Sequence, residues 1–441
     1  MSSDWQVKKL GEHCIKIGSG ATPKGGKEVY LDNGQYRLIR SQNIFNEGFN
    51  PSGLAYIDAD QAKKLDGVAV VAGDVLLNIT GDSVARVCLA PEKYIPARVN
   101  QHVAIIRPKP DVFDSRYVRY FLASKQQQNF MLGLAAAGAT RNALTKGMIE
   151  SFEIPSPPIE IQHSIAEILG SLEDRIALLR ETNKTLEALS QAIFKSWFID
   201  FDPVRAKMEG RTPVGLDEKI AALFPDELVQ SELGLIPRGW GCMDLADVSS
   251  YLSRGLSPKY TEVGGILVLN QKCVRDFAVD YTKGRRHDLI KRKVDGRLLE
   301  IGDVLVNSTG VGTLGRLAQI LSLDEPVIVD SHLTVVRAGQ KVSWPYLGEC
   351  MKKMQPTIES MGEGSTGQTE LSRGKLGGLK IIVPATKVQD AFDSIVEPLK
   401  ASIALNVKKS FTLSQLRDLL LPRLISGKLG LLDADSVEGL V

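Results

Sequence analysis

The strongest constraint on this chain is a long internal repeat. The stretch Gly73 to Gly81 returns 229 residues later as Gly302 to Gly310, with seven of nine positions identical. The match extends outward, since Trp5 corresponds to Trp240. Solenoid repeats have periods of about 20–50 residues, so this period indicates a duplicated domain. The sequence therefore predicts a pseudo-two-fold molecule suited to a target that is itself bipartite.

The composition is that of an ordinary globular protein with room for two to four domains. The chain has 441 residues, of which 43% are hydrophobic and 24% charged. Its five cysteines are scattered and never spaced C-x-x-C, so we expect neither a disulfide framework nor a metal site. The sequence holds no run of eighteen apolar residues and begins without a signal peptide, which predicts a cytoplasmic location.

The first part of each copy is typical of a mixed α+β unit of roughly 150 residues. Short apolar or alternating runs at 68–71, 74–78 and 102–107 are typical of strands, and glycine and proline separate them. A helix is predicted from Asp114 to Leu132.

The second part of each copy is predicted to be a long helix. It follows Pro155-Ser156-Pro157-Pro158 in the first copy, and apolar residues then alternate at spacings of four and three. That spacing is a heptad seam, which requires a partner helix. The first seam is Ile165, Leu169, Leu172, Ile176, Leu179, Leu186 and Ile193, and the second is Phe392, Val396, Leu399, Ile403, Leu413 and Leu420.

Polar residues fill some positions of both seams. Asn183 and Asn406 either fix the register of the pair or are tolerated near water, and the sequence leaves both interpretations open. Arg417 in the second seam argues against strict symmetry there. Two tandem copies related by a two-fold axis would pair these helices antiparallel.

We therefore predict an α+β chain with two tandem pseudo-symmetric α/β globular domains, separated by two long helices that form an antiparallel coiled coil. The predicted boundaries are 1–158 for the first domain, 159–200 for the first helix, 201–238 for a connecting segment, 239–385 for the second domain, 386–427 for the second helix and 428–441 for a tail.

Common catalytic motifs are missing from the sequence. The sequence has no Asn/Asp-Pro-Pro-aromatic motif of adenine methyltransferases, no G-x-x-x-x-G-K-[ST] phosphate loop and no H-E-x-x-H. The segment 310–315 matches G-x-G-x-x-G, but 81–86 of the first copy does not, so a loop is favoured over a dinucleotide site. His102 and His332 recur at matching positions, as structural residues or as base contacts.

Basic residues indicate a nucleic-acid partner. Residues 283–297 hold seven lysines and arginines against two aspartates, so the local charge is 7 − 2 = +5 in a chain whose net charge is +2. The segment is either a solvated face or a phosphate-binding patch. The comparable stretch of the first copy, around Lys63 and Lys64, lacks it.

Candidate DNA contacts lie in glycine-flanked, basic or amide-rich loops. Arginine pairs with guanine, and asparagine or glutamine pairs with adenine. In the first copy the candidates are Lys24, Arg37, Arg40, Gln42, Asn43, Arg86, Gln101, Arg141 and Asn142. In the second copy they are Arg254, Lys259, Asn270, Gln271, Lys272, Arg275, Arg285, Arg286, Arg292, Lys293, Arg316, Gln368 and Arg373.

The whole chain resembles the specificity (S) subunit of type I restriction–modification systems. The resemblance is carried by the order of the duplicated Gly73–Gly81 stretch, Ile154 to Gln162, Ser196 to Arg205 and Ser231 to Trp240. It implies that each globular unit is a target-recognition domain reading one half of an asymmetric, bipartite DNA sequence. The helices would then set the spacer and dock two modification (methyltransferase) subunits, and restriction (helicase–nuclease) subunits would join them.

The resemblance also implies a subunit without catalytic activity or cofactor, with S-adenosylmethionine, Mg and ATP on partner subunits only. Two alternatives stay open: a self-contained, internally duplicated DNA methyltransferase or nuclease, and a protein–protein scaffold. The missing motifs and the basic loops argue against them. The second copy has 382–389 where the first has Ile154 to Gln162, which keeps the helix entry but makes the two docking surfaces unequal.

Overall fold

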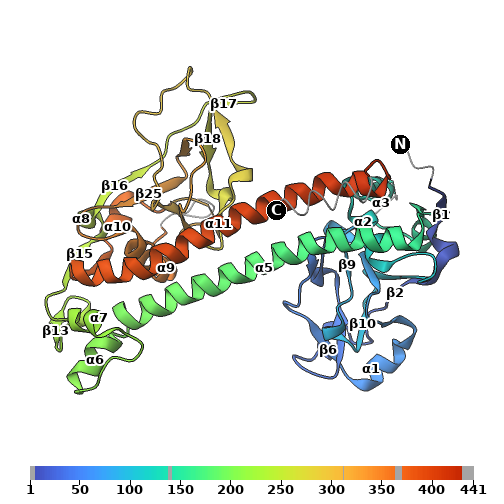
Figure 1. The fold of residues 1–441 in the computed structure, drawn as a ribbon, viewed down its shortest axis with the longest axis horizontal. Helices are drawn as coiled ribbons and strands as arrows, with labels where there is room; N and C mark the ends of the chain where they lie inside the picture. Colours follow the sequence, from blue (N-terminus) through green and yellow to red (C-terminus); the bar gives the residue numbers. More distant parts are fainter. Residues whose placement is uncertain (1–4, 138–141, 311, 363–369, 430–441) are drawn as a thin grey trace. The chain divides into compact units, whose positions relative to one another are not determined.

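The computed structural model describes residues 5–137, 142–310, 312–362 and 370–429. The chain divides into two compact units, one of residues 1–178 with 410–441 and one of residues 179–409. Each unit contains one globular domain and a part of both long helices, α5 (Ile159–Phe198) and α11 (Thr386–Ile425) (Figure 1). The predicted α+β class, with duplicated domains and two long helices, is confirmed.

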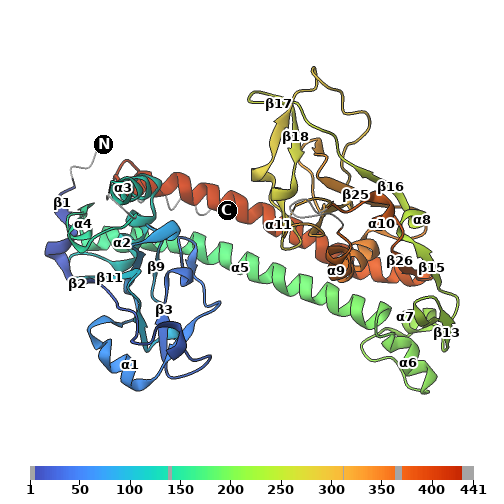
Figure 2. The same ribbon diagram turned by 180° about the vertical axis from the view of Figure 1, so that it is seen from behind.

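The first unit is built on two four-stranded sheets. One is antiparallel, with the strand order β2 (Cys14–Ser19), β11 (Val103–Pro108), β8 (Val75–Asn78) and β9 (Val87–Leu89). Helix α2 (Ser115–Ala123) lies against β8 and β9, and Figure 2 shows α2 beside β9. The other sheet has the order β6 (Ala55–Ile57), β3 (Tyr36–Ile39), β10 (Ala97–Val99) and β7 (Ala69–Val70), with β3 and β10 parallel.

Smaller elements complete the first unit. They are the pair β1 (Val7–Lys9) and β12 (Glu153–Pro155), the hairpin β4 (Ile44–Phe45) and β5 (Gly48–Phe49), and helices α1 (Ala59–Lys64), α3 (Lys125–Ala136) and α4 (Lys146–Glu150).

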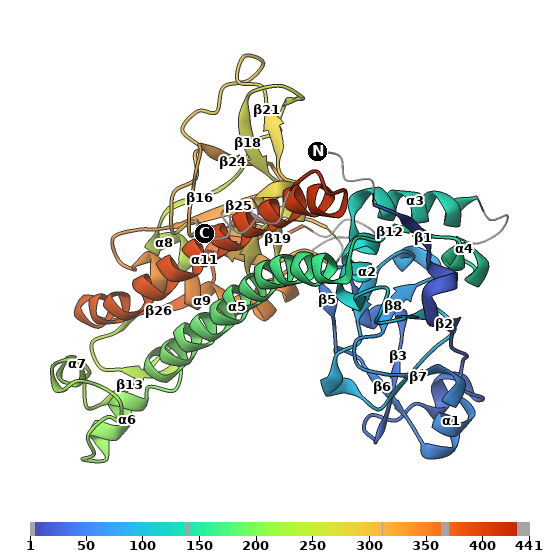
Figure 3. The ribbon, with the colours of Figure 1, turned by 45° about the vertical axis from the view of Figure 1, so that its right-hand side comes forward.

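The second unit repeats this topology. Its first sheet has the order β16 (Ser249–Arg254), β25 (Leu333–Ala338), β22 (Val304–Asn307) and β23 (Leu317–Gln319), and α9 (Trp344–Ser360) lies against β23 and β25. Its second sheet has the order β17 (Tyr260–Thr261), β21 (Arg285–His287), β18 (Ile266–Leu269) and β24 (Val327–Val329), with β18 and β24 parallel (Figure 3).

The second unit also contains smaller elements. They are the pair β15 (Gly241–Asp244) and β26 (Lys380–Val383), the hairpin β19 (Val274–Arg275) and β20 (Ala278–Val279), and the short helices α8 (Leu245–Val248) and α10 (Arg373–Gly377).

One buried ion pair explains part of the sequence repeat. Asp74 lies at the start of β8 and binds Arg107 of β11 through two bonds of 2.7 and 2.8 Å. Asp303 binds Arg337 of β25 with the same two distances. Both aspartate side chains are fully buried. The repeated Gly-Asp therefore anchors the same sheet in both domains.

The predicted helix from Asp114 to Leu132 is wrong in one respect, because it is two helices. The backbone of Ser124 is extended, at φ −61° and ψ 143°, which ends α2. The Ser124 hydroxyl then accepts a hydrogen bond from the Gln127 amide and caps α3. The corresponding α9 of the second unit runs on for 17 residues.

The long helices run antiparallel within the second unit. The Asn406 side-chain amide donates to Asn183 Oδ1 at 2.9 Å, and the rings of Phe194 and Phe392 lie 6.1 Å apart. The two asparagines thus bind each other inside the seam, as the register interpretation requires. In the first unit, Arg417 lies 3.6 Å from Glu173.

The seam residues predicted from the heptad spacing are buried or half-buried. Ile165, Leu169, Leu172, Ile176, Leu179, Phe392, Val396, Ile403, Leu413 and Leu420 are buried, and Leu186, Ile193 and Leu399 are half-buried.

The segment between the copies is partly helical and packs through aromatic side chains. It contains α6 (Asp202–Met208), α7 (Glu218–Leu223) and the hairpin β13 (Leu228–Ser231) with β14 (Gly234–Pro237). Trp197, Phe201, Phe224 and Trp240 belong to one core cluster of the second unit.

The secondary structure bears on the predicted loop at 310–315 and on membrane spans. The glycine-rich segment 310–315 leads into strand β23 and not into a helix, so it lacks the helix N-terminus that a dinucleotide site needs. Within the described part of the chain, no helix has the length and apolar character to cross a bilayer.

Candidate nucleic-acid interface

A threonine–histidine pair occurs at the same place in both domains. Thr80, after β8, lies 2.5 Å from His102 Nδ1, and Thr309, after β22, lies 2.8 Å from His332 Nδ1. The backbone repeats this geometry, since the carbonyls of His102 and His332 accept from the amides of residues 79 and 308 at 3.0 and 2.9 Å. The recurrence of the two histidines in the sequence therefore reflects a local structure that both domains share.

The turn before each histidine is fixed by a side-chain hydrogen bond and by the close approach of a glycine. The amide of His102 donates to Asn100 Oδ1, and that of His332 donates to Asp330 Oδ1. Burial raises the pKa of Asp330, and the bond from His332 opposes that shift. A Cβ at Gly20 or Gly255 would lie 1.6 or 2.1 Å from a carbonyl oxygen of the turn, so only glycine fits there. His102 is half-buried and His332 is exposed.

The first domain holds most of its predicted DNA contacts in ordered loops. Arg37, Arg40 and Arg86 are half-buried and stack over Tyr56, Tyr30 and Phe45. Cation–π stacking holds the guanidinium without neutralising it, so these arginines keep their charge.

The polar residues of the first domain differ in exposure. Lys24, Gln42, Gln101 and Asn142 are exposed. Asn43 is fully buried, where its amide donates to the Asn50 carbonyl at 2.9 Å and its oxygen accepts from the Arg40 amide at 3.0 Å. Its side chain is used inside the domain, so the structure gives Asn43 a supporting role instead of the predicted base contact.

In the second domain, several predicted contacts already have protein partners. Arg254 pairs with Glu370 and donates to the Leu371 carbonyl at 2.8 Å. Asn270 caps the turn at Lys272, with 2.9 Å from the Lys272 amide to Asn270 Oδ1. The side chains of Lys259, Lys272, Arg275 and Arg373 are exposed, whereas Gln271 and Arg316 are half-buried.

The basic segment 283–297 forms β21 and the loop that follows it. Asp288 Oδ1 accepts from the amides of Ile290 and Lys291 at 2.9 and 3.2 Å, and buried His287 accepts from the Lys259 amide at 2.9 Å. These bonds fix a loop whose tip, Ile290, is 98% exposed.

Five of the seven cations of this segment fall into two groups. Arg286 pairs with Glu325, and Lys283 lies 3.0 Å from Asp280, so acids outside the segment reduce its charge from +5 to 7 − 4 = +3. Arg285 lies 3.5 Å over the ring of Tyr260, Arg292 donates to the Ser257 carbonyl at 2.8 Å, and Lys293 is exposed. The second group retains its charge for a ligand.

The remaining candidates, Arg141 and Gln368, lie outside the described residues. Within those residues, no group of three histidine, cysteine or acidic side chains could hold a metal ion.

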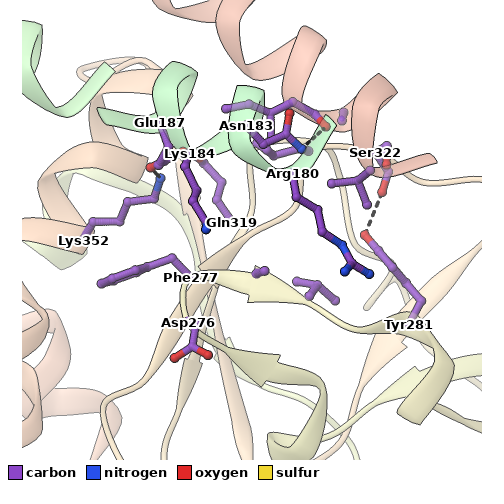
Figure 4. A pocket seen from close by; sticks show the side chains of 16 residues that line it. Arg180, Asn183, Lys184, Glu187, Asp276, Phe277, Tyr281, Gln319, Ser322 and Lys352 are labelled. Atoms are coloured by element: carbon purple, nitrogen blue, oxygen red, sulfur yellow. Dashed lines mark hydrogen bonds and ion pairs between the residues drawn. The ribbon is translucent and has the colours of Figure 1, made fainter. Parts of the chain in front are cut away.

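A cavity of about 330 Å³ lies in the second unit between α5, α11 and the β19–β20 hairpin (Figure 4). Phe277 of the hairpin turn lines it, with a left-handed backbone at φ +59°. Two of its charged lining residues, Glu187 of α5 and Lys352 of α9, are bound to each other. That pair thus joins α5 to α9 at the wall of the cavity.

Sequence reasoning missed the ion clusters that join each domain to its helices. In the first unit Arg119 binds Glu173 at 2.7 Å, and in the second Lys400 binds Glu349 at 2.6 Å. Charged residues at helical positions resemble a solvated face, and only Glu173 and Lys400 occupy matching positions of the repeat.

The fold defines a class of protein: two duplicated α+β domains, each joined to an antiparallel pair of long helices. The family described as "Type I restriction modification DNA specificity domain" matches residues 2–188.

Relatives match nearly the whole chain. The MjaIX specificity subunit of Methanocaldococcus jannaschii, a type I restriction enzyme component, is 23% identical over 97% of this chain and 94% of its own. The HindI specificity subunit of Haemophilus influenzae is 23% identical over 97% of this chain and all of its own. The S subunit from M. genitalium has the same fold, with a TM-score of 0.60, 17% identity and 96% coverage of each chain. Over nearly its whole length, the chain is thus similar to the specificity subunits of type I restriction enzymes.

Proposed function

We propose that this chain is the sequence-specific DNA-recognition and assembly subunit of a type I restriction–modification complex. The observation that carries the proposal is the duplication: two domains of one topology present different surface residues on a shared frame. Each domain would read one half of a bipartite, asymmetric double-stranded DNA target. Neither a self-contained methyltransferase nor a self-contained nuclease has support from the relatives or the fold.

The DNA contacts remain predictions at the level of single residues. The exposed or stacked cations of the first domain, and Arg285, Arg292 and Lys293 of the second, are the best supported of them. Charged side chains held over aromatic rings suit phosphate or guanine contacts, because both need a positioned and uncompensated cation.

We propose further that the subunit has no catalytic activity and no cofactor. S-adenosylmethionine, Mg and ATP would belong to the modification and restriction subunits. Helices α5 and α11 would dock two methyltransferase subunits, and apolar side chains on them support this, because Leu189, Leu405 and Val407 are each about half-exposed. The purified chain should methylate no DNA, whereas the chain with its modification subunits should.

Domain exchange tests the division of labour. Residues 240–380 would be replaced by the same region of another specificity subunit, and the methylated motif would be determined by methylome sequencing. One half of the motif should change and the other should stay. A change in both halves would show that one domain does not read one half-site.

The helices give a second test, because they would set the number of unread base pairs. One heptad added to both helices keeps the seam and lengthens each by about 10 Å at 1.5 Å per residue. DNA rises about 3.4 Å per base pair, so the spacer should grow by about three base pairs with both half-sites unchanged. An active heptad variant with an unaltered spacer would contradict this role.

A further inference from the structure

In each unit, a glutamine of the long helix makes the same two hydrogen bonds at the junction with the recognition domain that precedes the helix. Gln162 of α5 donates to the carbonyls of Val112 and Pro157, at 2.9 Å each. Gln389 of α11 donates to the carbonyls of Lys341 and Pro384, at 3.0 and 2.9 Å. Neutral bonds to backbone atoms fit any domain of this fold, so these anchors do not distinguish one domain from the other.

A tyrosine repeats the same pattern. The hydroxyl of Tyr117 in α2 donates to the Pro155 carbonyl at 3.0 Å, and that of Tyr346 in α9 donates to the Ile382 carbonyl at 2.6 Å. These anchors align the two junctions residue by residue. Tyr117 and Tyr346 are 229 residues apart, and Gln162 and Gln389 are 227 apart.

In the first unit, the domain supplies the base and the helix supplies the acid. Arg119 of α2 binds both oxygens of Glu173 on α5, at 2.7 and 2.8 Å, and the Tyr120 hydroxyl donates to the same carboxylate at 3.1 Å. The Arg119 side chain is only 5% exposed. Near the start of α2 a second carboxylate, Asp114, also belongs to the domain.

In the second unit, the pair between the domain and the helix that follows it is reversed, because α9 of the domain supplies the acid and α11 supplies the base. Glu349 of α9 binds Lys400 of α11 at 2.6 Å, and both side chains are 1% exposed. Lys352 of α9 lies 3.3 Å from Glu349 and also binds Glu187 of α5. Burial lowers the pKa of Lys400, whereas the two glutamates raise that of Lys352 despite burial.

The second carboxylate of the junction also differs in position, because it belongs to the domain in the first unit and to the helix in the second. Ser343 caps α9, and its hydroxyl donates to Asp393 of α11 at 2.8 Å. By the alignment of the anchors, Glu349 replaces Tyr120, Ser343 replaces Asp114, Lys400 replaces Glu173 and Asp393 replaces Ala166. The junction therefore carries charges of opposite sign in the two units, at buried or half-buried positions.

We infer that this reversed charge pattern assigns each recognition domain to its own helix. The first domain placed on α11 would bring Arg119 toward Lys400 and Asp114 toward Asp393. The second domain placed on α5 would bring Glu349 against Glu173. Buried like charges lack compensation and oppose docking, whereas neutral anchors alone would allow either arrangement. The unit that can be exchanged between the first and second copies is thus a recognition domain together with the helix that follows it.

A domain transplant tests the assignment in the full chain. Residues 239–385 would be replaced by a second copy of residues 1–158, with α11 unchanged. This chimera should lose the cooperative thermal unfolding of the second unit. The same chimera with Lys400→Glu and Asp393→Ala, which gives α11 the charges of α5, should regain it. A chimera that folds without the two substitutions, or one that fails equally with them, would overturn the inference.

Charge reversal in the natural chain provides an independent arm. Glu349→Lys alone and Lys400→Glu alone should each lower Tm by roughly 10 °C, because each leaves buried like charges. The double variant Glu349→Lys/Lys400→Glu should recover most of that loss. The control is the exposed pair Glu181 and Lys184 of α5, whose reversal should leave Tm unchanged. A double variant no more stable than the sum of the single effects would refute the charge assignment.

Discussion

The two recognition domains share a frame and differ in where they place their cations. Both have the same antiparallel sheet, the same aspartate–arginine pair and the same threonine–histidine pair. The first domain stacks Arg37, Arg40 and Arg86 on three different aromatic rings. The second concentrates its cations in 283–297. The interior bonds are thus the same in the two copies, whereas the positions of the surface cations differ.

This difference also shows how local charge should be counted. The sequence window 283–297 appears strongly basic, yet Glu325 and Asp280 lie beside Arg286 and Lys283. Pairing in space, and not proximity in sequence, decides which cations remain for phosphate. A comparison of paired and unpaired cations is therefore more informative than removal of the whole segment.

The largest effect is expected from the shared frame. Asp74→Ala and Asp303→Ala should each destabilise the chain by about 3 kcal/mol or more, because each leaves a partly buried arginine without its carboxylate. The loss should be smaller for Asp303, since Arg337 also binds Glu300. Urea denaturation would measure both. The control Asp324→Ala removes an exposed carboxylate and should change stability by less than about 0.5 kcal/mol. Equal losses for all three variants would mean that the frame is not held by these pairs.

The next effect concerns the unpaired cations of the second domain. Replacement of Arg285, Arg292 and Lys293 by glutamine should weaken binding to all DNA sequences alike. The slope of log affinity against log salt should shrink by about 0.9 for each lost phosphate contact. Arg286→Gln should have a smaller effect, because Glu325 already neutralises that side chain.

The matched control for this prediction is in the first domain. Lys63→Gln and Lys64→Gln remove exposed cations from the comparable stretch, where acids balance them, and should leave the slope unchanged. If the triple variant binds with the wild-type slope while folding normally, segment 283–297 is a solvated face.

The sequence alone predicted features that recur or have a period. The Gly73–Gly81 repeat predicted the duplicated domain, and the heptads predicted the seam from Ile165 to Leu179, because burial imposes these patterns directly. It did not predict the break at Ser124 or the burial of Asn43. Both depend on side-chain bonds to backbone atoms, which leave no periodic signal.

The candidate interface was less accessible to sequence reasoning for a related reason. Residue type identified Arg286 and Arg285 equally, yet one has an acid partner and the other has a ring. The partners come from positions 325 and 260, and no local pattern connects them. Tertiary contacts decide the role of a cation, so single assignments needed the structure.

A smaller and equal effect is expected from the threonine–histidine pairs. Thr80→Val and Thr309→Val each remove one side-chain hydrogen bond and should destabilise their domain by about 1 kcal/mol. The methylated motif should remain the same, because the same pair in both domains cannot distinguish two different half-sites. Chemical denaturation and methylome sequencing measure the two parts. A changed half-site in either variant would place that pair among the base readers.

The smallest expected effect is a pH dependence present in the second unit, where Asp393 stands at the position that Ala166 occupies in the first. Burial raises the pKa of Asp393 to about 6, partly opposed by the bond from Ser343 and reinforced by Glu397 and Asp390. The folded state therefore binds more protons than the unfolded state between about pH 4 and 6, and stability should fall as pH rises through that window. Asp393→Asn should remove this fall and make the chain more stable than wild type at pH 7, by less than about 1 kcal/mol because Asp393 is half-buried and screened by solvent. The two proteins should converge below pH 4, where Asp393 is protonated in both states. Unfolding curves recorded from pH 4 to 8 would test this, and a stability difference that does not vary with pH would assign the gain to packing and not to the carboxylate.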